Sequence, residues 1–283
     1  MNLEEIICGK AVPGLPVACQ GVECSYSSIA CRQVFCNPEI TFYETFEEVF
    51  QSVIEGKNTY GVVPIENTLA GSVTDNYDLM LEYNLFIAAS VTVKIDHCLL
   101  ALPGTRLEEI RHIYSHPQAL HQCSDFFRSH REITPHTYSN TAASAQFVAQ
   151  QQNPSFGAIG SIACGEKYGL EILTQGLQNR KNNYTRFVVV SKDGAASPLC
   201  SRISLILRLA HRPGALVRTL SHFAEKNINL LKLESRPIPD SPFEFLFYCD
   251  FAGNIADTNV QLALGQLPQD IIFMKFLGNY PEE

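Results

Sequence analysis

The chain has 283 residues, of which 46% are hydrophobic and 18% are charged, and its formal net charge is −8 at pH 7. The composition is typical of a globular protein, and the length predicts two domains, with three compact lobes as the alternative. The negative charge argues against a nucleic-acid-binding surface, which is normally basic, but it allows a locally positive cleft for a small anion. No apolar segment approaches the roughly 18 residues of a membrane-spanning helix, and no signal peptide is visible, so we expect a cytoplasmic protein without membrane contact.

The ten cysteines follow no metal-binding or disulfide pattern, and no CxxC pair occurs in the sequence. Because a secretion signal is not visible, we expect reduced, structural thiols. His112 and His116 have the i,i+4 spacing of metal ligands on a helix, but Pro117 and the strand-like segment HIYSH argue against one helix that holds both. We therefore expect no metal site.

From residue 17 to 192 the sequence repeats a short apolar strand, a polar turn and an amphipathic helix. The strand–helix pairs are PVACQG with SYSSIACRQVF, YGVVPIEN with VTDNYDLMLEY, IRHIYSH with PQALHQCSDFFRS, ITPHTYSN with TAASAQFVAQQ, and FGAIGS with IACGEKYG. Alternating strand and helix periods predict a parallel or mixed sheet with helices on its faces.

After SKDGAASPLCS the pattern changes, and we place a domain boundary near residues 193–200. RISLILRLA is a predicted strand, and RPGALVRTLSHFAEKN is a predicted helix with Pro213 in its first turn. INLLKLESRP and FEFLFYCDFAG are two strands joined by the turn IPDSP, followed by the helix DTNVQLALGQL and the strand IIFMKFLG. This order predicts a ferredoxin-like βαββαβ domain.

Hydroxyl residues mark the points where predicted strands end and helices begin. Taken singly, each of them is explained as a helix cap. Taken together, they place several helix N-termini at one edge of a sheet, where α/β proteins bind ligands and where anions are favoured. These residues are Ser25, Ser72, Ser115, Thr141 and Ser161.

The turn GVVPIENTLAGSV at residues 61–73 is the most informative one in the first half. Glu66 and Asn67 directly follow an apolar strand, so their polar groups must be paired or must face a cleft. Gly71 would allow a ligand to approach the backbone closely. This turn therefore predicts a polar site at the strand exit.

SHPQALHQ repeats this design, because Ser115 and His116 precede Pro117 at a helix start. Gln118 and Gln122 lie one helical turn apart on the same face. For Gln122 a solvated helix face and a cleft position are equally supported by the spacing.

The segment NNYTRF places a hydroxyl beside a fixed cation. Arg186 is suited to a carboxylate, and Thr185 is a neutral donor and acceptor, so the pair suits a substrate with carboxylates and a leaving hydroxyl. Taken alone, the segment is better explained by a β-forming threonine at Thr185 and an exposed edge charge at Arg186. The motifs must therefore be considered together.

In order along the chain, GVVPIENTLAGSV, SHPQAL, YSNTAASA, GAIGSIACGEKYGL, NNYTRF, RPGAL and ESRP resemble the motifs of prephenate dehydratases with a C-terminal ACT regulatory domain. The resemblance covers residues 17–283. It implies an α/β fold with a bilobed, periplasmic-binding-protein type II-like catalytic region at 17–192 and an ACT domain at 201–283. Lobe one would comprise 17–92 and 184–192, and lobe two would comprise 93–183.

The resemblance implies that prephenate loses water and carbon dioxide to give phenylpyruvate, in phenylalanine biosynthesis, without any cofactor. The threonine of the TRF motif, here Thr185, would assist departure of the hydroxyl, and Arg186 and the helix N-termini would hold carboxylates. The implied catalytic residues are Thr185, Arg186, Glu66, Asn67, Ser115 and Gln122. The implied substrate-binding residues are Phe187, Gln118, Thr141, Ser72 and His116.

The resemblance also implies feedback regulation by L-phenylalanine at an interface between subunits of a homodimer or homotetramer. The segments that carry this implication are RPGAL and ESRP. Taken singly, RPGAL is also explained as an ordinary helix start and ESRP as an ordinary strand end. The implied effector-binding residues are Gly214, Ala215, Leu216, Glu234, Ser235, Arg236 and Pro237.

The chain departs from the family pattern at Cys24 and Ser25, which replace the Gly and Ala of the usual GVEGAYS motif. Because Cys adopts positive φ less readily than Gly, we expect this turn to be reshaped. Residues 1–16 are too few for the helical chorismate mutase that is fused to some family members.

Two other functions stay open. Arogenate carries an amino group where prephenate carries a keto oxygen, and these residues do not distinguish an arogenate dehydratase. A non-catalytic amino-acid sensor with the same bilobed fold would need the cleft but not a hydroxyl beside a cation. Thr185 next to Arg186 therefore favours the enzyme.

Overall fold

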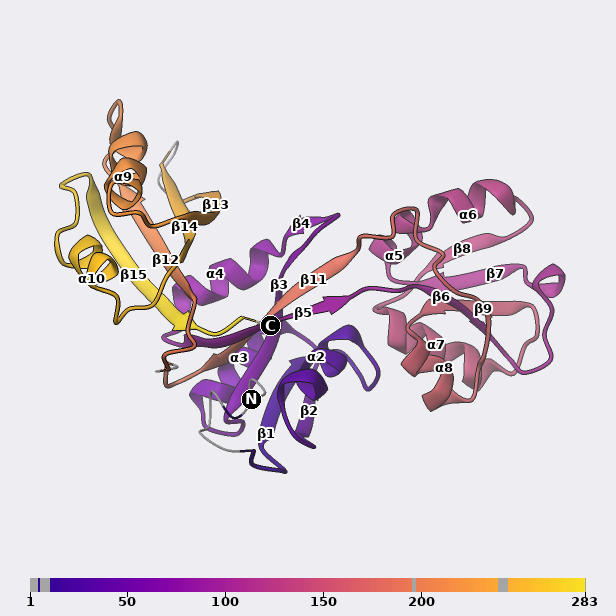
Figure 1. The fold of residues 1–283 in the computed structure, drawn as a ribbon. Helices are drawn as coiled ribbons and strands as arrows, with labels where there is room; N and C mark the ends of the chain where they lie inside the picture. Colours follow the sequence, from indigo (N-terminus) through magenta and orange to yellow (C-terminus); the bar gives the residue numbers. More distant parts are fainter. Residues whose placement is uncertain (1–4, 6–10, 195–196, 239–243, 283) are drawn as a thin grey trace.

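The computed structural model describes residues 5, 11–194, 197–238 and 244–282. These residues form three α/β bodies, each built on its own sheet, and the first lobe lies between the second lobe and the C-terminal domain (Figure 1). Within the described ranges, no helix is long and apolar enough to cross a membrane, and no group of three or more His, Cys, Asp or Glu side chains is arranged to bind a metal ion.

The first lobe is a mixed sheet with three helices. Its strands follow the order β2 (Glu39–Tyr43), β1 (Pro16–Gln20), β3 (Tyr60–Asn67), β11 (Tyr184–Ser191) and β5 (Phe86–Lys94), with the short β4 (Gly71–Ser72) against β3. The helices are α2 (Tyr26–Val34), α3 (Phe46–Ile54) and α4 (Thr74–Glu82). Strand β1 is parallel to β2 and β3, whereas β11 is antiparallel to β3 and β5, so the predicted mixed sheet is present.

The second lobe has a five-stranded sheet. Its strands follow the order β10 (Glu171–Thr174), β6 (Cys98–Ala101), β9 (Phe156–Gly160), β7 (His112–Ser115) and β8 (Thr134–Thr137). Its helices are η1 (Leu107–Glu109), α5 (Pro117–Gln122), α6 (Ser124–Ser129), α7 (Thr141–Gln151) and α8 (Ile162–Tyr168). The helix predicted over PQALHQCSDFFRS is thus divided at Cys123, which is a buried free thiol.

Two chain segments connect the lobes. Residues 95–97 lead from β5 into β6, and residues 175–183 return from β10 to β11. The two crossings lie side by side, because the Ile95 amide donates to the Asn183 carbonyl at 2.8 Å. Any residue on these segments is therefore placed between the lobes.

The C-terminal domain has the predicted βαββαβ order. Its elements are β12 (Arg202–Leu209), α9 (Ala215–Ala224), β13 (Leu230–Pro237), β14 (Phe245–Ala252), α10 (Thr258–Gly265) and β15 (Ile271–Tyr280). The antiparallel sheet order β13-β14-β12-β15 is ferredoxin-like. Helix α9 begins at Ala215 after the cap Gly214, so Pro213 precedes the helix and does not lie in its first turn. Most of the predicted turn IPDSP lies outside the described residues.

The two faces of the C-terminal sheet have different partners. In β12, Leu205 and Leu207 pack with the helices of the domain, whereas Ile206 between them packs with Ile87 and Val188 of the first lobe. Each fully buried aliphatic side chain of this kind contributes about 1.5–3 kcal/mol. The C-terminal domain is therefore attached to the first lobe through a shared hydrophobic core.

Candidate active site

A cavity of about 560 Å³ lies between the two lobes. Residues of both lobes line it, and most of the residues expected at the site are among them. These are Asn67, Ser72, Thr185 and Phe187 from the first lobe and His116, Gln118, Gln122 and Thr141 from the second lobe.

Arg186 and Glu66 face away from this cavity. Strand residues alternate between the two faces of a sheet, so Thr185 and Phe187 line the cavity and Arg186 points to the other side. There Arg186 is 7% exposed, and its guanidinium donates to Glu66 at 2.7 Å and to Asp250 of β14 at 2.8 Å. The expectation that Arg186 holds a substrate carboxylate does not fit this placement.

Ser115 is also absent from the cavity lining. Its side chain is fully buried at the end of β7, and its hydroxyl donates to the Ile159 carbonyl at 2.7 Å. This contact joins two neighbouring strands just before helix α5. In the structure Ser115 supports the cap residue His116 and the first turn of α5, which contains Gln118.

The helix caps differ in part from the expected hydroxyl residues. Ser25 caps α2 by accepting from the Ser28 amide, but α5 is capped by His116 and α7 by Asn140. Thr141 is therefore the first helical residue and not the cap. Ser72 lies in β4, and the Ser161 hydroxyl, although at the start of α8, donates to the Cys24 carbonyl at 3.2 Å.

Helix N-termini supply the positive potential of the cavity. The first residues of α2, α4 and α7, each of nine or more residues, belong to its lining. Among the described residues of that lining there is no lysine or arginine, and Asp75 is the single carboxylate. The partial positive charge of these termini therefore favours the carboxylates of a small anion.

Thr185 carries the hydroxyl at the centre of the site. Across the β3–β11 pairing it lies opposite Asn67, and its Oγ1 accepts from the Asn67 amide group at 2.9 Å. Because this contact uses a lone pair, the Thr185 proton stays available for a group in the cavity.

Two histidines at the cavity are neutral, and the glutamate behind it is ionised. Burial lowers the pKa of His97 and His116, so both imidazoles are neutral at neutral pH. Burial opposes ionisation of Glu66, but Arg186 and Lys232 outweigh it, and the pKa of Glu66 is lowered. The cavity thus works mainly with neutral donors and helix termini.

Comparisons with known proteins agree with this geometry. Residues 17–195 match the family model of prephenate dehydratase. The chain belongs to the prephenate dehydratase family. The family and the fold class predicted from the sequence are thereby confirmed.

Similar proteins cover most of the chain. Arogenate dehydratase 2 of Petunia hybrida is 37% identical over 95% of this chain and 72% of its own length. The bifunctional chorismate mutase/prephenate dehydratase of Escherichia coli (strain K12) is 37% identical over 94% of this chain and 71% of its own. Prephenate dehydratase from Arthrobacter aurescens in complex with L-Phe is 28% identical, with a TM-score of 0.85 over 94% of this chain and 89% of its own.

Cys24, which replaces the glycine of the family motif, has a φ of 66°. A non-glycine residue in this left-handed conformation costs roughly 1–2 kcal/mol. The Cys24 carbonyl accepts from Ser161 and from the Cys164 thiol, so two bonds from the second lobe hold the strained residue. This turn is therefore part of the contact between the lobes.

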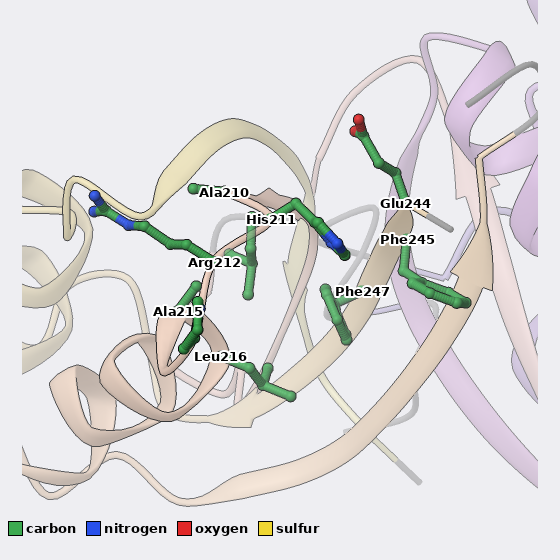
Figure 2. Close-up of a pocket in the computed structure, with 10 residues that line it drawn as sticks. Ala210, His211, Arg212, Ala215, Leu216, Glu244, Phe245 and Phe247 are labelled. Carbon is green, nitrogen blue, oxygen red and sulfur yellow. The ribbon is translucent and has the colours of Figure 1, made fainter. Parts of the chain in front are cut away.

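A second cavity, of about 360 Å³, lies in the C-terminal domain. Leu216, Phe245 and Phe247 give it apolar walls, and Ala215 belongs to its lining. Figure 2 shows that the Arg212 side chain extends away from the other labelled residues, and Arg212 pairs with Asp270. This segment of the family motif RPGAL thus borders a cavity large enough for an amino acid.

The ESRP segment is placed differently from the expectation. On one side of β13, Glu234 accepts from the Ser72 hydroxyl at 2.8 Å, and Arg236 pairs with Asp78. Ser235 and Pro237 are exposed on the other side. Within this chain, ESRP therefore does not border the cavity beside α9, and half of it contacts the first lobe.

Sequence reasoning missed several residues at the site of this prephenate dehydratase family member. His97, Tyr26 and Asn140 line the cavity, and the fully buried Asn183 accepts from the same Asn67 amide group that contacts Thr185. The available signal was a polar residue inside an apolar segment, as for His97 in IDHCLL. That signal was weak because a single buried histidine is common in protein cores.

Proposed function

We propose that the protein converts prephenate to phenylpyruvate with release of water and carbon dioxide. The observation that carries this proposal is the Thr185 hydroxyl, which lies in a cavity between the lobes with its proton available. The helix N-termini give this cavity an affinity for anions, and prephenate is a dicarboxylate. The family membership of the chain supports the same reaction.

The reaction needs orientation and a hydrogen-bond donor. As the ring carboxylate leaves as carbon dioxide, its C–C bond electrons enter the ring and expel the hydroxyl on the opposite ring carbon. Thr185 donates a hydrogen bond to that oxygen, and one proton from solvent, relayed through the Thr185 hydroxyl, converts the departing hydroxide to water. Phe187, Pro64 and Ile95 offer apolar contacts for the ring. Aromatisation supplies the driving force.

Arogenate is the second candidate substrate. Asp75 in the first turn of α4 is the one carboxylate among the described lining residues, and it favours the ammonium group that arogenate carries in place of the keto oxygen. The relatives that support the family include both kinds of dehydratase by name.

The test is turnover by the purified protein with prephenate and with arogenate in parallel, with and without L-phenylalanine. Phenylpyruvate formation from prephenate supports the proposal. Turnover of arogenate alone would keep the mechanism and change the substrate. No turnover of either, together with tight phenylalanine binding, would favour the non-catalytic sensor.

We further propose that the C-terminal domain is an ACT domain that binds L-phenylalanine. The cavity beside Ala215 and Leu216 supports this, as does the L-Phe complex of the Arthrobacter aurescens relative. Calorimetric titration with L-phenylalanine tests it, and Leu216→Asp should abolish the binding. D-phenylalanine is the control ligand.

A homodimer or homotetramer is the expected assembly. Strand β13 is an end strand of its sheet, and Leu231 and Leu233 on it are 41% and 37% exposed. An apolar edge strand of this kind is a pairing surface for a second copy. Light scattering coupled to size-exclusion chromatography gives the oligomeric state, and Leu233→Lys should shift it towards the monomer.

A further inference from the structure

A chain of side-chain amides connects Thr185 to the crossings between the lobes. The Asn67 amide nitrogen lies 2.9 Å from Thr185 Oγ1, 2.8 Å from Asn183 Oδ1 and 3.0 Å from the Tyr184 carbonyl, so these three acceptors share its two hydrogens. The Asn183 amide nitrogen donates in turn to Gln122 Oε1 at 2.9 Å. The same Gln122 oxygen lies 3.0 Å from His97 Nε2. His97 is 2% exposed and lies on the first crossing.

The direction of every bond in this chain is fixed from one end. Asn67 Oδ1 accepts from the backbone amides of Leu69 and Ala70, at 3.0 and 2.9 Å, and backbone amides are always donors. Asn67 must therefore present its NH₂ group to Asn183 and Thr185. It follows that Asn183 accepts at its oxygen and donates from its nitrogen, which makes Gln122 Oε1 an acceptor.

An acceptor at Gln122 requires a donor at His97. The His97 ring therefore carries its proton on Nε2, and in the neutral ring Nδ1 is unprotonated. The tautomer is set at Nε2, because the contact at Nδ1 is weak: the Tyr26 hydroxyl donates to the Asp96 carbonyl at 2.8 Å and lies 3.5 Å from Nδ1. The His97 backbone is held as well, since its amide donates to Gln178 Oε1 at 2.9 Å.

We propose that His97 is a positioning residue, which in its neutral Nε2–H form fixes the Gln122 amide so that the Gln122 NH₂ group donates into the cavity. With its oxygen bound by both His97 and Asn183, the amide cannot turn over without losing two hydrogen bonds. Gln122 thus offers the substrate a second donor in addition to the Thr185 hydroxyl, because both residues line the cavity. The role rests on the dehydratase activity proposed above.

The kinetic test compares His97→Leu with His97→Gln, whose amide nitrogen reaches the position of Nε2. The leucine variant should lower kcat about 10²-fold, the size expected for a misplaced catalytic contact, with little change in KM. The glutamine variant should recover most of that loss. In a Gln122→Ala background, His97→Leu should cost little more, because both changes remove one interaction. Equal costs in the two backgrounds would show that His97 acts independently of Gln122 and would overturn the proposal.

A second measurement does not depend on activity. Nitrogen NMR of the full chain with labelled histidine, with His97→Gln as the assignment control, should show a His97 ring protonated at Nε2 only. A ring protonated at Nδ1, or at both nitrogens, at neutral pH would contradict the proposal even where the leucine variant fails to fold. Wild-type protein without turnover but with the Nε2–H ring would refute the proposed reaction and leave the inferred hydrogen-bond direction intact.

Discussion

Arg186 of the catalytic strand β11 donates to Asp250 of the C-terminal strand β14 at 2.8 Å, and both side chains are less than a tenth exposed. Thr185 and Phe187, the neighbours of Arg186 in β11, line the cavity between the lobes. A displacement of the C-terminal domain therefore acts on the backbone that carries the Thr185 hydroxyl. The Arg186–Asp250 ion pair thus links that domain directly to the strand that carries Thr185.

Asp250→Asn should weaken the effect of phenylalanine on turnover while leaving phenylalanine binding within a few-fold of wild type. The variant removes one of the two carboxylates that pair with Arg186, the one on the C-terminal domain, and Asp250 does not line the cavity beside α9. Allosteric coupling of this kind amounts to about 1–3 kcal/mol, so inhibition should fall about 5–150-fold. Inhibition curves and calorimetry measure the two quantities. The control is Asp125→Asn, an exposed carboxylate paired with Arg128; equal inhibition in all three proteins would contradict the expected coupling.

Gly278→Ala should separate the C-terminal strand β15 from β5 of the first lobe. A Cβ at Gly278 would overlap the Ile87 carbonyl oxygen, and the φ of 154° is disfavoured for an L residue. We expect a loss of about 2–3 kcal/mol in stability and faster hydrogen exchange in β5 and β15. Gly265→Ala is the matched control, because no heavy atom lies within 4 Å of a Cβ there. Equal exchange rates in the two variants would refute the steric explanation.

Cys24→Gly should be more stable than Cys24→Ala by about 1 kcal/mol. Both variants lose the thiol packing, and they differ in the cost of the left-handed backbone at φ 66°. Urea midpoints of the two variants measure the difference. If the alanine variant were as stable as the glycine variant, the conformation of this turn would not be strained.

Much of the fold could be predicted from the sequence, because strand and helix periods are regular in both halves. The sequence pattern does not predict β2 and α3 at residues 39–54, nor β5 and β6 at residues 86–101. The second of these segments, FIAASVTVKIDHCLLA, is mostly apolar. Its pattern therefore does not show that β5 ends at Lys94 or that residues 95–97 cross between the lobes. Burial on both faces removes the period-2 pattern that marks a strand.

The site could be predicted only as a set of motifs. Thr185, Asn67 and Gln122 converge as the motifs imply, but Arg186 lies on the opposite face of the same strand. Strand alternation places Arg186 on the face opposite Thr185 and Phe187, and this could be predicted from the segment TRF. The contact of that face with the C-terminal domain could not be predicted from it. The partners of Arg186, Glu66 and Asp250, are 120 and 64 residues away in sequence.

The stability of the C-terminal domain should depend on Asp270 in acid. Hydrogen bonds from Arg218 and Arg212 lower the pKa of Asp270 from 3.8 to about 2. Because the folded state resists protonation, the Asp270 contribution is complete above about pH 4 and is lost as the pH falls towards 2. Urea midpoints between pH 5 and 2.5 should therefore show the gap between wild type and Asp270→Asn closing. A gap of constant size would mean that these ion pairs leave the pKa unchanged; Asp125→Asn serves as an exposed control.

Thr185→Val should lower kcat about 10²–10⁴-fold with a small change in KM. Valine keeps the shape of the side chain but removes the hydroxyl that donates to the departing oxygen. A loss confined to kcat identifies an interaction made in the transition state. Thr185→Ser keeps the hydroxyl and should retain most of the activity. Thr92→Val is the matched control, because Thr92 is exposed on the neighbouring strand β5 and is not in the cavity lining. A valine variant with unchanged kcat would exclude Thr185 as the donor and would leave the Gln122 amide as the candidate group.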